Sequence, residues 1–285
     1  VTLFEADARF GGHAHTVDVT LDGPTGAATH GVDTGFLVFN HATYPHLRQL
    51  FADLGVDTAP SEMSFSVQVP GADGRNALEW SGCNLDTVFA QRRNLLNPRF
   101  LGMLRDLLRF NRVTTQIAEA QQEAALQQPI GDFLAERGFS SAFRDWYLLP
   151  MLGCIWSCPT DQMLRFPVAT MIRFCHNHGL IRVLNRPQWH TVRGGSREYV
   201  RRMLARIPDA RLNMPVKAVR RLPPGPGSSG VWVDTTAGTE RFDDVVLAGH
   251  TDQSLALLGD HASADEHAVL GAIAYQRNRA VLHTD

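Results

Sequence analysis

Residues 1–16, VTLFEADARFGGHAHT, contain the pattern from which the architecture of the whole chain is predicted. The segment Val1–Glu5 joins β-branched and aromatic residues in one run, which is typical of a buried parallel strand. Arg9 to Gly12 then predicts a tight turn, and Thr16 to Leu21 alternates apolar and polar side chains as a strand does. The chain is therefore expected to begin with a strand, a turn and a second strand.

The same stretch holds residues suited to a dinucleotide. An acid at the carboxyl end of a parallel strand can accept both hydroxyls of an adenosine ribose, and Glu5 stands at that position. Arg9 adds positive charge for a pyrophosphate, and Gly11 and Gly12 let the backbone approach a ligand because they have no Cβ. Taken singly, a glutamate at a strand end is also typical of a solvated loop, and a glycine pair of a simple turn.

With Thr16, these residues form E-x-x-x-R-x-G-G-x-x-x-T, which resembles the pattern after the second strand of FAD-dependent amine oxidases and phytoene desaturases. Further similar segments follow in the family's order, so the resemblance covers most of the chain: Asp33–Phe36, Gly194–Ser196, Pro215–Val216 and Val245–His250. A narrower resemblance, at 186–189 and 278–283, is to bacterial predicted NAD/FAD-binding proteins associated with cyclopropane fatty acid synthases. That resemblance implies association with such a synthase.

The resemblance implies FAD as cofactor and an α/β fold, with a Rossmann-like FAD-binding domain at 1–85 and 190–285 and a mainly helical substrate domain inserted at 86–189. It implies that Glu5 holds the ribose and that Arg9, Gly11, Gly12 and Thr16 line the pyrophosphate and ribityl chain. Gly35 and Phe36 would lie near the flavin. Val216 would meet the adenine edge through its backbone, and a sheet-core valine is equally consistent with its position.

The hydrophobic pattern of the rest of the sequence agrees with this division into a strand-rich and a helical domain. Strands are expected at Gly31–Phe39, Ser64–Val69 and Ala77–Trp80, with a hairpin turn at Asp73-Gly74, and a helix at Tyr44–Leu54 ends at Gly55. Helical periodicity and prolines occupy 86–186, and strands return at 216–221, 231–235 and 244–248, with a flexible run at 223–230.

The G-x-G-x-x-G loop of dinucleotide-binding folds does not open this chain. The family's first strand therefore counts as missing, and both ends are expected to be truncated. Loss of a central strand exposes unpaired backbone groups on its neighbours, so the fragment alone is expected to be unstable, to bind FAD poorly and to be inactive.

Three kinds of residue are candidates for the chemistry. His250 follows an expected strand, where it can donate a proton, and a loop histidine with a backbone partner is the alternative. His13 and His190 are further candidates for the flavin and its pocket. Tyr147, Trp156 and Trp189 are candidates for an apolar substrate pocket, although most aromatic residues of this region are expected in the core.

Composition excludes several other classes. The formal net charge of −2 does not favour nucleic acid, and no apolar run is long enough to cross a bilayer. Cys154 and Cys158 have C-x-x-x-C spacing, which is not a zinc spacing, so no metal is predicted. Four cysteines in a chain of this length favour a reduced cytoplasmic setting.

Residues 92–112 predict an amphipathic helix. Leu96, Phe100, Leu104, Leu107 and Leu108 are expected on one stripe, with arginines opposite, and six arginines against one aspartate make the segment locally +5. Such a helix suits either an anionic membrane surface or a solvated face on the protein core.

The predicted function is FAD-dependent oxidation or desaturation of an apolar substrate, an acyl lipid or isoprenoid, or oxidation of an amine. The alternative is a non-catalytic flavin-binding partner of a lipid-modifying, methyltransferase-type enzyme. A nicotinamide-linked reductase is a third reading.

Overall fold

The chain divides into two compact units in a computed structural model that describes residues 1–24, 26–71, 77–122, 126–182, 186–222, 230–275 and 277–284. The strand-rich unit comprises Val1–Leu37, Leu50–Asp57 and Val192–Asp285. The helical unit comprises Val38–Gln49 and Thr58–Thr191. The expected turn at Asp73-Gly74 and residues 223–229 of the expected flexible run lie outside the described residues.

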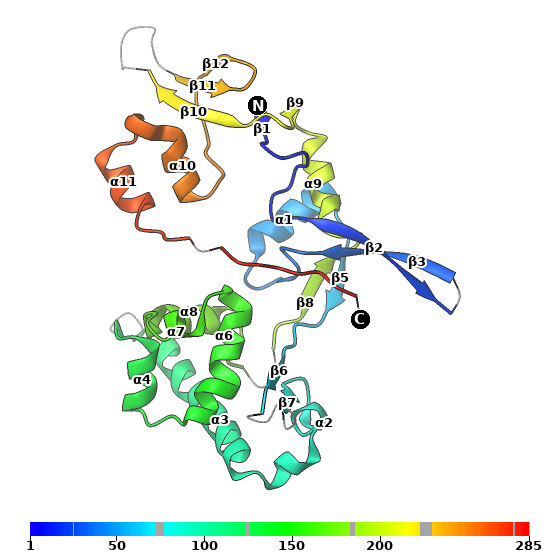
Figure 1. Cartoon of the computed structure of the whole chain (residues 1–285), viewed down its shortest axis with the longest axis vertical. Coiled ribbons are helices and arrows are strands. Elements are labelled where there is room, and N and C mark those ends of the chain that lie inside the picture. The colour runs from blue at the N-terminus through cyan, green and yellow to red at the C-terminus, as the bar shows by residue number, and fades with distance from the viewer. Residues whose placement is uncertain are drawn as a thin grey trace. The chain divides into compact units, whose positions relative to one another are not determined.

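The strand-rich unit places short sheets beside short helices (Figure 1). Its strands are β1 Thr2–Phe4, β2 Thr16–Gly23, β3 Gly26–Asp33, β9 Asp209–Arg211, β10 Val216–Arg221, β11 Val231–Thr235 and β12 Thr239–Phe242. Its helices are α9 Arg197–Leu204, α10 Thr251–Leu258, η4 Gly259–His261 and α11 Ala264–Leu270.

β1 forms as predicted and pairs in parallel with β9, with Thr2 opposite Asp209 and Phe4 opposite Arg211. The Glu5 N–H extends this pairing by donating to the Arg211 carbonyl at 2.9 Å. The strand is half-buried rather than buried, because β9 is its single partner among the described residues. Glu5 thus stands at the carboxyl end of a parallel strand, as expected.

The segment Gly31–Phe39 is not one strand. β2 and β3 form an antiparallel hairpin that pairs Thr16 with Asp33, and β3 ends there. The backbone at Gly35 then passes so close to the His13 carbonyl that a Cβ at this glycine would overlap its oxygen. This close approach bends the chain out of the ladder before β4 begins at Phe39.

β10, β11 and β12 form an antiparallel three-stranded sheet, and β10 and β11 match the prediction. The expected strand at 244–248 is wrong: the residues carry no strand assignment, and Val246 is 89% exposed. A strand requires a neighbour to complete its ladder, and none is found for this segment among the described residues.

Helix α1, Pro45–Leu54, confirms the predicted helix, and Gly55 ends it with a φ of +66°. Arginines of the α9 region satisfy carbonyl groups at this end. Arg202 donates to the Leu54 oxygen at 3.0 Å, and Arg206 donates to the Asp53 oxygen at 2.6 Å. This terminus is thereby tied to α9.

The helical unit contains β4 Phe39–Asn40, β5 Thr58–Ser61, β6 Ser66–Val69, β7 Leu78–Ser81, β8 Trp189–Val192, α2 Leu85–Val88, η1 Arg92–Leu96, α3 Pro98–Glu119, α4 Ile130–Glu136, α5 Ser141–Phe143, the π-helix η3 Arg144–Leu148, α6 Leu149–Trp156, α7 Thr160–Met163 and α8 Val168–Asn177. Val67 of β6 and Trp80 of β7 are buried in its core with Phe100, Phe110 and Phe143. This packing explains why residues 58–85 group with the helices.

The expected continuous helix over 92–112 is interrupted. Asn97 caps a new helix, α3, by accepting hydrogen bonds from the N–H groups of Arg99 and Phe100, and Pro98 occupies its first turn. Leu96 is therefore outside α3 and 89% exposed, and Leu108 is 53% exposed. The predicted leucine stripe is wrong at both positions.

No helix in the described part of the chain is long and apolar enough to span a bilayer.

Replacement of Glu266 tests the ion pair between β10 and α11. Arg221 donates to this carboxylate and lowers its pKa from 4.5 to about 2. A carboxyl group with a lowered folded-state pKa stabilises the fold above its unfolded pKa, and the contribution is lost as pH falls through the folded pKa. Glu266→Gln should slightly lower the Tm at neutral pH, and the difference should vanish as pH falls from about 4.5 toward about 2.

Thermal unfolding followed by circular dichroism across this pH range measures the difference. Glu62→Gln is the control, because Glu62 is exposed and has no ion pair among the residues described. A Glu266→Gln difference that grows at low pH would contradict the assignment.

Candidate functional site

The turn after β1 contains two glycines with positive φ. Gly11 and Gly12 have φ angles of +116° and +55°, which favour glycine. A Cβ at Gly11 would lie 2.5 Å from the Ala14 carbonyl oxygen, whereas one at Gly12 would meet nothing within 4 Å. Gly11 is therefore required for the turn, and Gly12 leaves a bare backbone facing open space.

Arg9 holds this turn and keeps donor capacity unused. Its Nη2 donates to the Gly12 carbonyl at 2.8 Å. Its Nη1 is buried and has no hydrogen-bond partner among the described residues. A buried guanidinium nitrogen without an acceptor is costly, so this atom is a candidate donor to an anionic group.

Glu5 retains acceptor capacity. Its Oε1 accepts a hydrogen bond from the Asp7 N–H at 2.9 Å, and no donor to Oε2 is found within the described segments. The side chain is half-buried at the end of β1. It can therefore accept from a ligand hydroxyl without losing its local contact.

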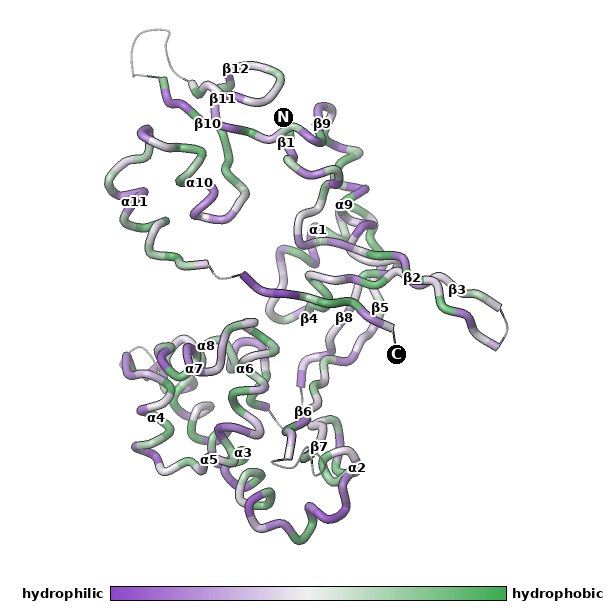
Figure 2. The backbone as a smooth tube through the Cα atoms, viewed as in Figure 1, coloured by the Kyte–Doolittle hydropathy of each residue, from purple (hydrophilic) through white to green (hydrophobic). Residues whose placement is uncertain are grey.

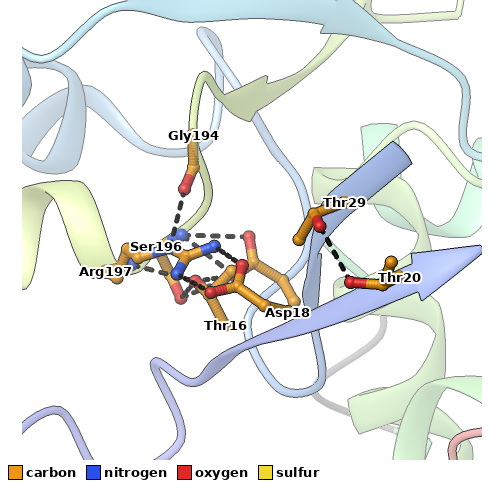
Figure 3. A network of polar contacts seen from close by, with 8 residues as sticks. Thr16, Asp18, Thr20, Thr29, Gly194, Ser196 and Arg197 are labelled. Atoms are coloured by element: carbon orange, nitrogen blue, oxygen red, sulfur yellow. Dashed lines mark hydrogen bonds and ion pairs between the residues drawn. The ribbon is translucent and has the colours of Figure 1, made fainter. Parts of the chain in front are cut away.

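The carboxylate of Asp33 is a hub that holds together the segments around the turn. Figure 3 shows two of its partners, Thr16 and Ser196, beside Arg197. Asp33 accepts from the Thr16 hydroxyl at 2.6 Å, from the Ser196 N–H at 2.9 Å and from the Ser196 hydroxyl at 2.8 Å. The Arg197 N–H donates in turn to Thr16 Oγ1 at 3.1 Å. The Thr16 hydroxyl is thus engaged within the protein, and its contact with a cofactor stays a prediction.

The turn before α9 packs directly against this hub. A Cβ at Gly195 would lie 2.5 Å from Thr16, and the φ of Gly195 is +88°. Beside it, the Arg197 guanidinium makes a two-nitrogen ion pair with Asp18 and, mainly through that hydrogen bond, lowers the pKa of Asp18. The residues Gly194–Ser196, singled out from the sequence, thus meet the β2–β3 hairpin.

A cavity of about 320 Å³ lies between the turn and α9. Arg9, Ala14 and Thr16 line one side, and Arg197 and Val200 line the other. Its volume is at the lower end of the range for small-molecule sites. The predicted residues Arg9 and Thr16 therefore line the same cavity.

Aromatic and imidazole rings gather beside the glycine turn. The His250 ring lies 5.8 Å from that of His13 and stacks at 4.5 Å on Tyr275. The backbone of His250 caps α10, since its carbonyl accepts from the Ser254 N–H at 2.8 Å. The structure thus brings His13 and His250 together, and it adds Tyr275, for which the sequence carried no signal.

The other predicted site residues are Phe36, Val216 and His190. Phe36 is half-buried after the Gly35 bend, and Val216 begins β10 opposite Thr235, next to a ladder irregularity. His190, on β8 of the helical unit, stacks on His41 at 4.1 Å, and burial lowers its pKa. The cofactor or pocket roles of these residues stay predictions.

The three aromatic residues expected to line a substrate pocket sit in the helical unit. Tyr147 is only 5% exposed and packs against Trp80 and Phe143, and burial raises its pKa. Trp156 packs on Phe166 and Phe174, and Trp189 is buried on β8. None lines the cavity at the turn or a second cavity of about 280 Å³ beside α4.

The cysteines differ in exposure. Cys83 and Cys154 are exposed, and burial raises the pKa of Cys175 to about 12. Among the described residues, no group of three or more His, Cys, Asp or Glu side chains is arranged to hold a metal.

Asp33→Asn tests the hub. An amide replaces one acceptor oxygen by a donor, so the contacts with Thr16 and Ser196 are disturbed. We expect the free energy of unfolding to fall by about 1–3 kcal/mol in chemical denaturation. Asp22→Asn, an exposed position on the same hairpin, should change it by less than about 0.5 kcal/mol. An equal change in the free energy of unfolding for the two variants would exclude a structural role for the hub.

Gly35→Ala tests the close approach to His13. A methyl group would overlap the His13 carbonyl oxygen, so we expect destabilisation of about 1–3 kcal/mol. Gly102→Ala is the matched control, since a Cβ in that helix meets nothing within 4 Å and should stabilise by about 0.5–1 kcal/mol. Denaturation midpoints of both proteins decide the question, and a neutral Gly35→Ala would disprove the steric argument.

Several solved structures are similar to this chain in fold. Cyclohexylamine oxidase from Brevibacterium oxydans IH-35A is similar with a TM-score of 0.67 and 19% identity, wild-type putrescine oxidase bound to putrescine with 0.59 and 17%, and a CLA-producing fatty acid isomerase from P. acnes with 0.57 and 16%. Each similarity covers 95% of this chain and 57% of the other chain. The chain thus spans little more than half the length of these proteins, and they show its fold.

A comparison with curated proteins found no match. A sequence model of the family described as flavin containing amine oxidoreductase matches residues 1–261, which include the glycine turn, the hub and His250. With the fold, this match agrees with the resemblance found in the sequence. The chain belongs to the flavin-containing amine oxidoreductase family.

Proposed function

We propose that the protein to which this chain belongs is an FAD-dependent oxidoreductase whose substrate is an apolar molecule or an amine. The observation that carries the proposal is the turn after β1, where the unused acceptor of Glu5, the buried unpaired Nη1 of Arg9 and the bare backbone of Gly12 follow one parallel strand. Family membership supports the same reading.

The residues present fit the chemistry of FAD. Glu5 would accept from the ribose hydroxyls, and Arg9 Nη1 would donate to a phosphate oxygen, which completes its buried hydrogen bonding. Gly12 would allow phosphate or ribityl atoms to approach the backbone. The cavity beside Arg9 and Thr16 would receive part of the ligand.

A bound flavin would supply the acceptor for a hydride equivalent taken from the substrate. The protein then needs to orient the substrate and exclude water, and a double-bond reduction also needs a proton donor. We assign this role to His250, which is exposed and whose ring lies 5.8 Å from His13 and 4.5 Å from Tyr275. Its role in this proposal is proton donation.

The substrate class is proposed by analogy with the neighbours. Their names include a cyclohexylamine oxidase, a putrescine oxidase and a fatty acid isomerase, so one fold serves both amines and acyl chains. We favour an acyl or isoprenoid substrate at the cytoplasmic side of a membrane, with peripheral contact through the region 92–112. An amine is the second substrate to test.

Absorbance of the purified complete protein is the first test. Flavin bands that are released by heat as FAD are expected, and a folded, colourless protein that takes up no added FAD would disprove the proposal. Anaerobic bleaching with acyl lipids, isoprenoids and amines then assigns the substrate. Bleaching by NADPH alone would indicate a nicotinamide-linked reductase, and a flavin indifferent to all of them would indicate a non-catalytic partner.

Glu5→Ala tests the ribose contact. Loss of hydrogen bonds from a charged acceptor costs about 1.5–3 kcal/mol, so FAD affinity in the complete protein should fall about 10- to 100-fold. Fluorescence titration of the apoprotein with FAD measures the Kd. The control is Glu62→Ala, at an exposed position, and an unchanged Kd for Glu5→Ala would exclude Glu5 from the site.

A further inference from the structure

Exposed leucines concentrate in one short part of the helical unit. Among the described residues, five of the sixteen exposed large hydrophobic side chains lie between residues 85 and 108, and all five are leucine. Figure 2 shows hydrophobic and hydrophilic segments alternating along this turn between α2 and α3. With two arginines of α3 they form what we call the Leu/Arg surface: Leu85, Leu95, Leu96, Leu101, Arg105, Leu108 and Arg112.

The α3 part of the Leu/Arg surface is one face of the helix. Leu101, Arg105, Leu108 and Arg112 follow the spacing i, i+4, i+7 and i+11, and all four are exposed. The opposite face carries the fully buried Phe100, Met103 and Phe110, so the helix is anchored in the core. The exposed leucines are therefore not the core-facing side of a displaced helix.

The segment before α3 fixes further leucines in solvent. Because Asn97 caps α3, the preceding η1 turn cannot join the helix, and its Leu96 is the most exposed leucine of the surface at 89%. Leu85, in the first turn of α2, is 78% exposed. Isolated exposed leucines are ordinary, whereas these fall on three successive elements, α2, η1 and α3.

The charge of this region is strongly positive. Residues 85–112 contain six arginines and two aspartates, a difference of +4. Both aspartates are already paired, Asp86 with Arg92 and Asp106 with Arg109. No carboxylate partner of Arg105 or Arg112 is found in the described part of the chain. The cations of the Leu/Arg surface are thus available to an anionic partner.

We propose that the Leu/Arg surface docks on the surface of an anionic lipid bilayer. The leucines would enter the boundary between headgroups and acyl chains, and the long side chains of Arg105 and Arg112 would reach lipid phosphates. A purely solvated face would carry polar residues where Leu101 and Leu108 stand. Pairing with a second copy would bring like charges together, which disfavours self-association.

Flotation with vesicles of phosphatidylglycerol and phosphatidylcholine in equal parts tests the proposal on the complete protein. Binding is expected, and it should weaken at least tenfold on pure phosphatidylcholine and at high salt, because anionic headgroups attract the arginines. Leu96→Gln/Leu101→Gln should lower the affinity about tenfold or more, since the apolar insertion is lost. Arg105→Gln/Arg112→Gln should remove most of the preference for anionic vesicles.

The control is Leu21→Gln, on β2 of the strand-rich unit, because Leu21 is 45% exposed and Leu101 is 42% exposed. It should bind as the unaltered protein does. Failure of the unaltered protein to float with anionic vesicles would overturn the proposal, as would equal binding by the leucine pair and the control. The unaltered protein could instead form an oligomer that Leu96→Gln/Leu101→Gln dissociates, without binding vesicles. That result would assign the surface to a protein interface and would also overturn the proposal. The readout does not depend on flavin.

Discussion

The carboxylate of Asp33 is the interaction on which the strand-rich unit depends. It receives hydrogen bonds from Thr16, at the start of β2, and from Ser196, immediately before α9, although these residues are far apart in the chain. Hydrogen bonds to a charged acceptor are stronger than neutral ones. Because β2 follows the Gly11-Gly12 turn and Gly35 lies two residues after Asp33, the same contact fixes the backbone of the glycine turn and of the Gly35 bend.

The helical unit relies on apolar packing. Its core contains a contiguous group of rings from Trp80 through Tyr147 and Phe143 to Phe110, with centroid separations of 5.1–6.0 Å. The buried Asp106 is satisfied by the Ser140 N–H at 2.9 Å and by Arg109. The two units thus differ in kind: one is positioned by directional polar contacts, and the other by close packing of side chains.

Features that depend on neighbouring residues were predictable from the sequence. β1, α1 with its Gly55 cap, β10 and β11 were correctly expected, because alternation, helical spacing and a left-handed glycine are local signals. The interruption at Asn97-Pro98 also has a local signal, a capping residue followed by proline. The apolar spacing continues across it, so periodicity alone did not reveal where the helix begins.

Features that depend on distant partners were not predictable in the same way. The segment 244–248 has the composition of a strand, yet composition says nothing of whether a neighbour completes its ladder. The resemblance identified Asp33 and Ser196 separately but gave no reason for their contact, and the stacking of Tyr275 on His250 had no pattern at all.

The chain passes into and out of the helical unit by strands that are hydrogen-bonded to one another. β4, β8 and β5 lie in that order in one sheet, so the ends of the long segment 58–191 are held close together. An insertion whose ends are adjacent can be exchanged in evolution without rebuilding its host. Within this family, the helical unit can therefore diversify while the strand-rich unit keeps its fold.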